Sequence, residues 1–283
     1  MVPVCDTIFL KYCAYSDNSL ASSLFVYQAS RSFEMKYLRI LAISWFFLFG
    51  TAAHAAGTLS AEEILKTTDR SRGGGMAGIQ WELKIIAMDP DTGENIRKLL
   101  VRASGDNSVA ETVFPARAAG GRLLQLGRNM WYGRPDLQKP VSISSRQKLI
   151  GPAANGDIAS TNYLKDYDAK IIRMDSFEGE PVYVLELKGK SHFVTYDKII
   201  YWVSQAKVLP VKAEFMTVSG KIFKTAVFET KNTISVDGKK VPFVSRMTIR
   251  DNYDNDKVSI LEYSSIKVGA FPMDMFSVTR LMR

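Results

Sequence analysis

Very few side chains in this sequence could carry out acid–base or nucleophilic chemistry. The chain has two histidines, His54 and His192, and two cysteines, Cys5 and Cys13. His192 could be the base of a Ser–His–Asp arrangement, but it lies in a Gly-Lys-Ser-His-Phe stretch typical of a loop, and no G-x-S-x-G motif precedes it. An ordinary surface histidine explains it better. We therefore expect no enzymatic activity.

Metal and phosphate sites have equally little support. A site built from several His or Cys ligands is excluded by their number. Residues 251–256, Asp-Asn-Tyr-Asp-Asn-Asp, could form a calcium loop, but they lack the glycine and the distal glutamate of an EF-hand, and a hairpin turn accounts for them. The glycines at 73–75 precede a predicted strand rather than a helix, which disfavours a phosphate loop. We predict no metal and no cofactor.

Many apolar and aromatic residues lie on the predicted strands. One interpretation is that these side chains fill a core. The other is that one curved face of a sheet encloses an apolar cavity for acyl chains. The periodicity of hydrophobic residues does not distinguish a filled core from a hollow cavity. The residues that we expect to line such a cavity are Trp81, Leu83, Ile85, Met130, Tyr132, Tyr183, Leu185, Tyr201, Val203, Phe215, Phe228 and Met247.

The elements that position these residues follow from a period of two in hydrophobicity. Many short strands joined by Gly, Asp, Asn or Pro turns predict an antiparallel sheet that curls or closes. The turn at 89–93, Asp-Pro-Asp-Thr-Gly, is one example. The predicted strands are residues 79–88, 96–103, 108–114, 123–132, 169–174, 182–188, 194–203, 208–218, 221–230, 241–250 and 257–263.

Two regions break this pattern. Ser60 and Glu63 form a capping box, which predicts a short helix over about residues 61–71. The stretch 144–167 has Gly-Pro and Asn-Gly pairs and few β-branched residues, and we predict short helices at 144–149 and 158–164. Helices inserted in this way commonly cover the concave face of a curved sheet.

Composition and charge indicate a folded domain. The 283 residues are 46% hydrophobic and 23% charged, which is neither a disordered chain nor a membrane bundle. The net charge of +8 is spread thinly, without a basic run like those of nucleic-acid-binding arms. We therefore expect no nucleic-acid partner. The same charge is compatible with attraction to anionic lipid headgroups.

The N-terminal part has the order of a secretory signal. Lys36 and Arg39 precede an apolar run at 40–49, and Ala53-His54-Ala55 supplies small residues at the two positions read by a signal peptidase. We expect residues 1–34 to be a non-native upstream extension, 35–55 a signal peptide, and 56–283 a single β domain. A genuine extension at 1–34 is the alternative. The apolar run is shorter than the roughly 20 residues of a membrane span, so export to the periplasm is favoured.

Motifs spread over the exported part resemble the periplasmic LolA-like outer-membrane lipoprotein-sorting proteins, in a divergent branch. They follow the capped helix at Ser60 in the order given below. They are residues 129–135 (NMWYGRP), 144–151 (SSRQKLIG), 155–158 (NGDI), 166–167 (DY), 194–203 (VTYDKIIYWV), 209–215 (LPVKAEF), 219–224 (SGKIFK) and 271–276 (FPMDMF).

The resemblance implies a mainly β (α+β) fold, a strongly curved antiparallel half-barrel with a few helices over its concave face. It also implies a carrier that shelters the acyl chains of lipoproteins or lipids on their way towards the outer membrane. Its partners would be that cargo, an inner-membrane transporter and an outer-membrane acceptor. The alternative is an envelope sensor of the same fold that contacts a membrane protein.

The proposed processing predicts the mass of the exported protein. Cleavage after Ala55 leaves a chain that begins at Ala56, because the small residues at 53 and 55 are those that the peptidase recognises. Intact-mass measurement and N-terminal sequencing of protein from the periplasm should find this species. A periplasmic form that retains residues 1–34 would contradict both the boundary and the start at Met35.

Overall fold

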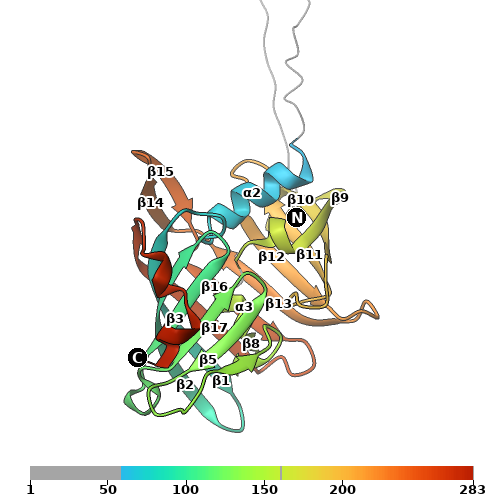
Figure 1. The fold of residues 1–283 in the computed structure, drawn as a ribbon. Coiled ribbons are helices and arrows are strands. Elements are labelled where there is room, and N and C mark those ends of the chain that lie inside the picture. The colour runs from blue at the N-terminus through green and yellow to red at the C-terminus, as the bar shows by residue number, and fades with distance from the viewer. Residues whose placement is uncertain (1–58, 160, 283) are drawn as a thin grey trace, which may run out of the picture. The chain divides into compact units, whose positions relative to one another are not determined.

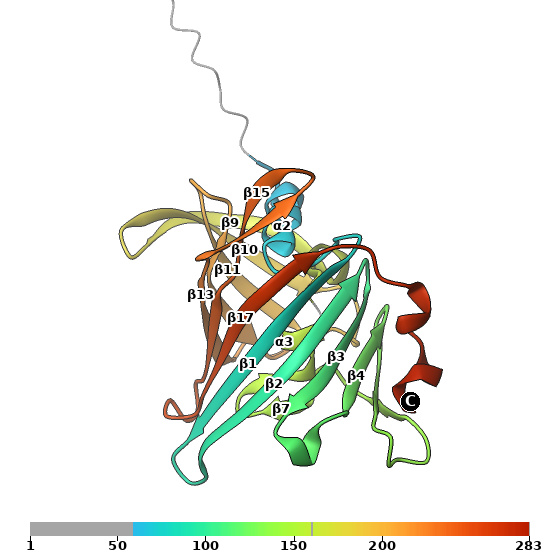
Figure 2. The ribbon, with the colours of Figure 1, turned by 90° about the vertical axis from the view of Figure 1, so that its left-hand side faces the viewer.

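A computed structural model describes residues 59–159 and 161–282. The predicted extension and signal peptide lie outside these residues. These described residues form one compact unit. Its main element is a sheet of 13 antiparallel strands that curves without closing, as the resemblance predicts (Figures 1 and 2). In the described part of the chain no helix has the length and apolarity needed to cross a bilayer.

The sheet consists of two runs of neighbouring strands that meet in its middle. The strand order is β6-β5-β4-β3-β2-β1-β17-β16-β13-β12-β11-β10-β9. The first run contains β1 (Ile79–Asp89), β2 (Gly93–Ser104), β3 (Asn107–Phe114), β4 (Arg122–Leu126), β5 (Asn129–Gly133) and β6 (Val141–Ile143). The second contains β9 (Tyr167–Phe177), β10 (Glu180–Gly189), β11 (Lys198–Ser204), β12 (Pro210–Met216), β13 (Ile222–Glu229), β16 (Arg246–Asp251) and β17 (Val258–Val268).

Smaller elements cover the sheet. Helix α2 (Ala61–Arg70) begins at Ser60, whose side chain and that of Glu63 form the predicted capping box. Figure 1 shows α2 crossing one end of the sheet, near the hairpin of β14 (Asn232–Val236) and β15 (Lys239–Phe243). The connection between the two runs holds β7 (Lys148–Ile150), β8 (Ala153–Ala154), α3 (Asn155–Ala159) and α4 (Tyr163–Asp166). Single-turn helices η1 (Ala116–Ala118), η2 (Met273–Met275) and η3 (Val278–Met282) complete the described elements.

Alternation along the strands gives the concave face its apolar character. In β1, Trp81, Leu83 and Ile85 are buried on that face, while Glu82 points to solvent. The register pairs Leu83 with Leu99 on β2 and with Tyr263 on β17, so the apolar rows continue across neighbouring strands. Burial of these rows against the covering elements builds the main hydrophobic core.

Several strands are apolar on their convex face as well. Figure 2 shows the C-terminal turns beside β4, and η3 contacts β4 and β5. There Phe276 and Leu281 pack with Val109 and Leu124. On β10 and β11 a second convex cluster contains Trp202, and the Lys212 ammonium lies 4.4 Å from its ring. These strands are therefore apolar on both faces although the sheet is open and does not close into a barrel.

Some sequence-based expectations about elements were wrong. Residues 123–132 form two strands, because Gly127 has φ of +59° and reverses the chain between β4 and β5. Residues 241–250 divide between β15 and β16, since the Val244 amide donates to Ser71 O (2.8 Å) rather than to a sheet partner. The strands β6, β7, β8 and β14 were not predicted.

The predicted helix at 144–149 is absent. Ser145 Oγ donates to Phe193 O (3.0 Å), and the Arg146 guanidinium donates to Val194 O (2.9 Å) and pairs with Asp197 (2.6 Å). These contacts with a loop distant in sequence hold the segment in a turn that leads into β7. The predicted helix at 158–164 corresponds to the end of α3 and the start of α4.

The paired apolar rows predict a large loss of stability when one member is truncated. Leu83→Ala removes a side chain that is 1% exposed in the sheet centre, and we expect the free energy of unfolding to fall by about 2–5 kcal/mol. The matched control, Glu82→Ala, changes the next residue on the solvent side and should change it by less than about 0.5 kcal/mol. Urea unfolding of both variants checks this, and equal effects would refute the assigned faces.

Candidate ligand-binding cavity

The concave face is covered by the connection between the two strand runs. We call residues 148–159 and 161–166 the plug. All five residues of α3 are buried, and Figure 2 shows α3 inside the curve of the sheet. The Asp157 carboxylate accepts hydrogen bonds from Ala154 N and Tyr196 Oη, both at 2.8 Å. Ser259 Oγ, on the central strand β17, donates to Ile150 O at 3.0 Å. The first part of the plug is therefore joined to both the sheet and the 189–197 loop.

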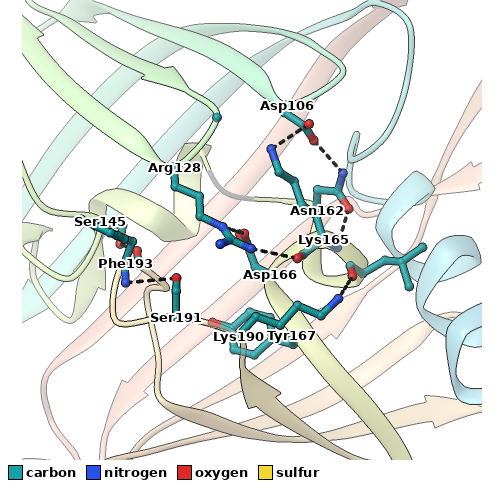
Figure 3. Close-up of polar contacts among 12 residues, drawn as sticks. Asp106, Arg128, Ser145, Asn162, Lys165, Asp166, Tyr167, Lys190, Ser191 and Phe193 are labelled. Carbon is teal, nitrogen blue, oxygen red and sulfur yellow. Dashed lines mark hydrogen bonds and ion pairs between the residues drawn. The ribbon is translucent and has the colours of Figure 1, made fainter.

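The second part of the plug is held to the first strand run by charged side chains, which Figure 3 shows. Asp106, in the β2–β3 turn, pairs with Lys165 (2.7 Å) and accepts from Asn162 Nδ2 (3.1 Å). Arg128, in the β4–β5 turn, pairs with Asp166 at 3.4 Å. Burial raises the pKa of Asp166, and the nearby Arg128 opposes this shift. Most of these groups are partly exposed, so each ion pair alone contributes little.

Further contacts hold α4 from the opposite side. Lys190 Nζ donates to Leu164 O at 3.0 Å, from the loop that follows β10 (Figure 3). Asp69, near the end of α2, accepts from Leu164 N at 2.8 Å. The Arg72 guanidinium lies 4.5 Å from the centre of the Tyr163 ring. The plug is thus bound by α2, by two turns of the first strand run and by one loop of the second.

An apolar cavity of about 380 Å³ remains between the plug and the first strand run. This volume is at the lower end of the range of small-molecule pockets. At its edge Val141 is 49% exposed, so the cavity reaches solvent beside β6. Its lining comprises Arg97, Leu99, Ala110, Thr112, Leu123, Tyr132, Leu137, Val141, Ile143, Leu149, Asn155 and Ile158.

The structure separates the twelve predicted cavity residues into three groups. Tyr132 lines the cavity. Tyr183 is half-buried and packs against the main core. The others are fully packed in that core, under the plug and α2: Trp81, Leu83, Ile85, Met130, Leu185, Tyr201, Val203, Phe215, Phe228 and Met247.

Most of the cavity lining was not among the predicted residues. Leu99, Ala110 and Leu123 lie on predicted strands, and their alternation with polar residues could have identified them. Leu149 and Ile158 belong to the plug, whose position depends on contacts distant in sequence. Sequence periodicity contains no comparable signal for these two residues.

A second groove of about 590 Å³ lies at the other end of the sheet. Its apolar lining includes Met76, Ile234, Val236, Val241 and Val268, so the β14–β15 hairpin forms one wall and the end of β17 another. Thr67 and Arg70 of α2 contribute a polar margin. The groove contains none of the predicted site residues.

The groups considered for catalysis or metal binding are dispersed. His192 is exposed in the loop after β10, with its ring 4.0 Å from that of Phe193. Residues 251–256 connect β16 to β17 as a hairpin turn, as predicted, and Asp254 pairs with Lys257. Within residues 59–159 and 161–282, no three His, Cys, Asp or Glu side chains form a group that could hold a metal ion.

The contact between α2 and the plug predicts a pH dependence. Burial raises the pKa of Asp69 to about 7, although the amides of Leu164 and Tyr163 and the charge of Arg72 oppose the shift. Between an unfolded-state pKa of about 4 and pH 7, the folded protein keeps a proton that the unfolded chain has released, so stability falls as pH rises.

The Asp69→Asn variant removes this titration and keeps an oxygen that accepts from Leu164 N. As pH rises from 4 to 7.5, the free energy of unfolding of the variant should increase relative to that of the unsubstituted protein by up to about 4 kcal/mol. Urea unfolding at several pH values measures the difference. Parallel stability–pH curves would show that the Asp69 pKa is not raised.

Known proteins share this architecture. A LolA superfamily protein from Nitrosomonas europaea is 34% identical, with a TM-score of 0.70 over 78% of this chain and 98% of its own. A domain from Vibrio parahaemolyticus named for outer membrane lipoprotein sorting is 20% identical, with a TM-score of 0.66 over 79% and 98% of the two chains. A DUF1329 family protein from Desulfovibrio piger is 16% identical, with a TM-score of 0.65 over 78% and 97%. The last two show a shared fold.

Sequence comparisons add one match. A model of a family of uncharacterized proteins matches residues 104–283, and no curated protein matches the chain. The matched region runs from the end of β2 to the C-terminal turns and includes the plug and most of the cavity lining. With 34% identity across 98% of the Nitrosomonas europaea protein, the chain belongs to the LolA superfamily.

Proposed function

We propose that the protein is a periplasmic, non-enzymatic carrier that shelters the acyl chains of lipoproteins or lipids for transfer towards the outer membrane. The observation that carries this proposal is the apolar cavity between the plug and the concave face of the sheet. Membership of the LolA superfamily and the likeness to a domain named for outer membrane lipoprotein sorting support it.

The chemistry of the cavity suits an alkyl chain. Burial of each methylene group removes about 0.8 kcal/mol of unfavourable hydration, so an unprotected acyl chain would scarcely remain dissolved in water. Leucine, isoleucine, valine and alanine side chains supply most of the lining. A carrier also has to release its cargo. Partly exposed ion pairs of the kind that hold α4 allow an attachment that can be broken.

The plug gives this carrier a way to adapt its volume. The ring centres of Tyr163, on α4, and Tyr201 lie 5.7 Å apart, and the ring planes make an angle of 68°, an edge-to-face contact. We propose that displacement of the plug exposes the core residues predicted as a cavity wall, among them Tyr201 and Val203. A donor transporter in the inner membrane and an acceptor at the outer membrane would use this displacement in loading and unloading.

A substitution that fills the cavity tests the proposal. Ala110, on β3, is 2% exposed and lines the cavity, so Ala110→Phe should occupy the space and weaken binding of a fluorescent fatty-acyl probe at least tenfold. The matched control is Val113→Phe, on the same strand but 52% exposed, which should leave binding unchanged.

Native mass spectrometry of protein purified from the periplasm, followed by solvent extraction, provides the complementary measurement. A co-purifying lipid or acylated peptide is the expected result. An unbound mass that stays the same when lipids are offered, together with equal probe affinities of the two phenylalanine variants, would refute the carrier and favour a partner-binding sensor.

A further inference from the structure

One charged side chain lines the apolar cavity. Arg97, on β2, is opposite Ile85 in the register with β1, and so belongs to the same inward row as Leu99 and Val101. It is the only Asp, Glu, Lys, Arg or His residue among those that line the cavity. A guanidinium on this face is unexpected, because every other inward residue of the β2 row from Leu99 to Ala103 is apolar.

Arg97 lacks a compensating anion. Its Nε is buried and has no hydrogen-bond partner, and the side chain makes no ion pair with any carboxylate of residues 59–159 and 161–282. The charged and titratable groups that act on it are Tyr132, from β5, and a second cation, Arg117, from η1. Burial and Arg117 both lower the pKa of Arg97, although an arginine stays protonated.

Arg97 is half-buried, and its unpaired Nε beside an apolar cavity is unfavourable for the protein alone. Removing a charged donor from water without an acceptor disfavours the folded state, and proteins usually pair such groups. A ligand with an anionic group would supply the missing acceptor. The planar guanidinium can donate two parallel hydrogen bonds to a carboxylate or phosphate. The polar groups of Thr112, Tyr132 and Asn155 also lie in the lining.

We propose that the cavity selects a single alkyl chain with an anionic head, carboxylate or phosphate, and that Arg97 binds this head with help from Arg117. The inference rests on the proposed carrier function and narrows its cargo. The cavity of about 380 Å³ is small for a ligand site, which suits one chain better than several. The chain would extend from Arg97 across Leu99 and Ala110 towards Ile158.

Three probes with the same sixteen-carbon chain separate head recognition from chain binding. Palmitate and hexadecyl phosphate carry an anion, and hexadecanol does not. We expect both anions to displace a bound fluorescent acyl probe about tenfold more effectively than the alcohol, given the usual strength of charge-assisted hydrogen bonds. Arg97→Gln should abolish this preference and leave the affinity for hexadecanol unchanged.

The control is Lys98→Gln, which removes one charge from the next residue on the opposite face of β2 and should keep the preference. If Arg97→Gln does not fold, Arg117→Gln, at an exposed position, should still reduce the preference two- to threefold. A carboxylate that outcompetes the phosphate would indicate fatty-acid cargo, and the reverse would indicate a single-chain phospholipid, that is, a lysophospholipid.

Two other results have distinct meanings. Equal binding of all three probes, or an anion preference that survives both arginine substitutions, would overturn the proposed role of Arg97 and leave the carrier function intact. No binding of any probe would overturn the carrier function itself.

Discussion

The structure depends on the need to cover the concave face of an open, curved sheet. Thirteen strands place alternate side chains on that face, and the row through Trp81, Leu83 and Ile85 cannot remain in contact with water. A closed barrel would fill its own interior. Here the edges β6 and β9 stay apart, so helices α2, α3 and α4 have to supply the other half of the core. This cover is incomplete beneath β2–β6, which is where the cavity lies.

The cover is attached in two different ways. At β7 and α3, buried hydrogen bonds from Ser259 to Ile150 and from Tyr196 to Asp157 join the cover to the central strand and to the loop after β10. At α4, partly exposed ion pairs such as that of Asp106 with Lys165 occur beside buried contacts of Leu164 with Asp69 and of Tyr163 with Arg72. Buried polar contacts are expensive to break, while exposed ion pairs exchange readily with water. The ion pairs at α4 can therefore exchange with water, but α4 uncovers Tyr201 only when its buried contacts with Asp69 and Arg72 also break.

The sequence predicted features that depend on neighbours along the chain. The capping box of α2 and the alternation in β1 are local, and both were confirmed. The merged strand 123–132 shows the limit, because a single glycine, Gly127, reversed the chain within an apolar run. Alternation also placed the predicted residues on the inner face. It does not reveal which parts of that face the plug covers, since Leu149 and Ile158 reach their positions through distant contacts.

The meeting of β1 with β17 in the middle of the sheet has a consequence for how the chain folds. Each strand run can form step by step from hairpins, but the two runs share a sheet only through pairs such as Leu83 with Tyr263. Contacts between segments so far apart in sequence are slow to form, because a long loop has to close first. If the N-terminal part becomes available to fold first, the first run can form while its β1 edge still lacks β17, residues 258–268. That exposed edge is the point at which a holding chaperone would be most valuable.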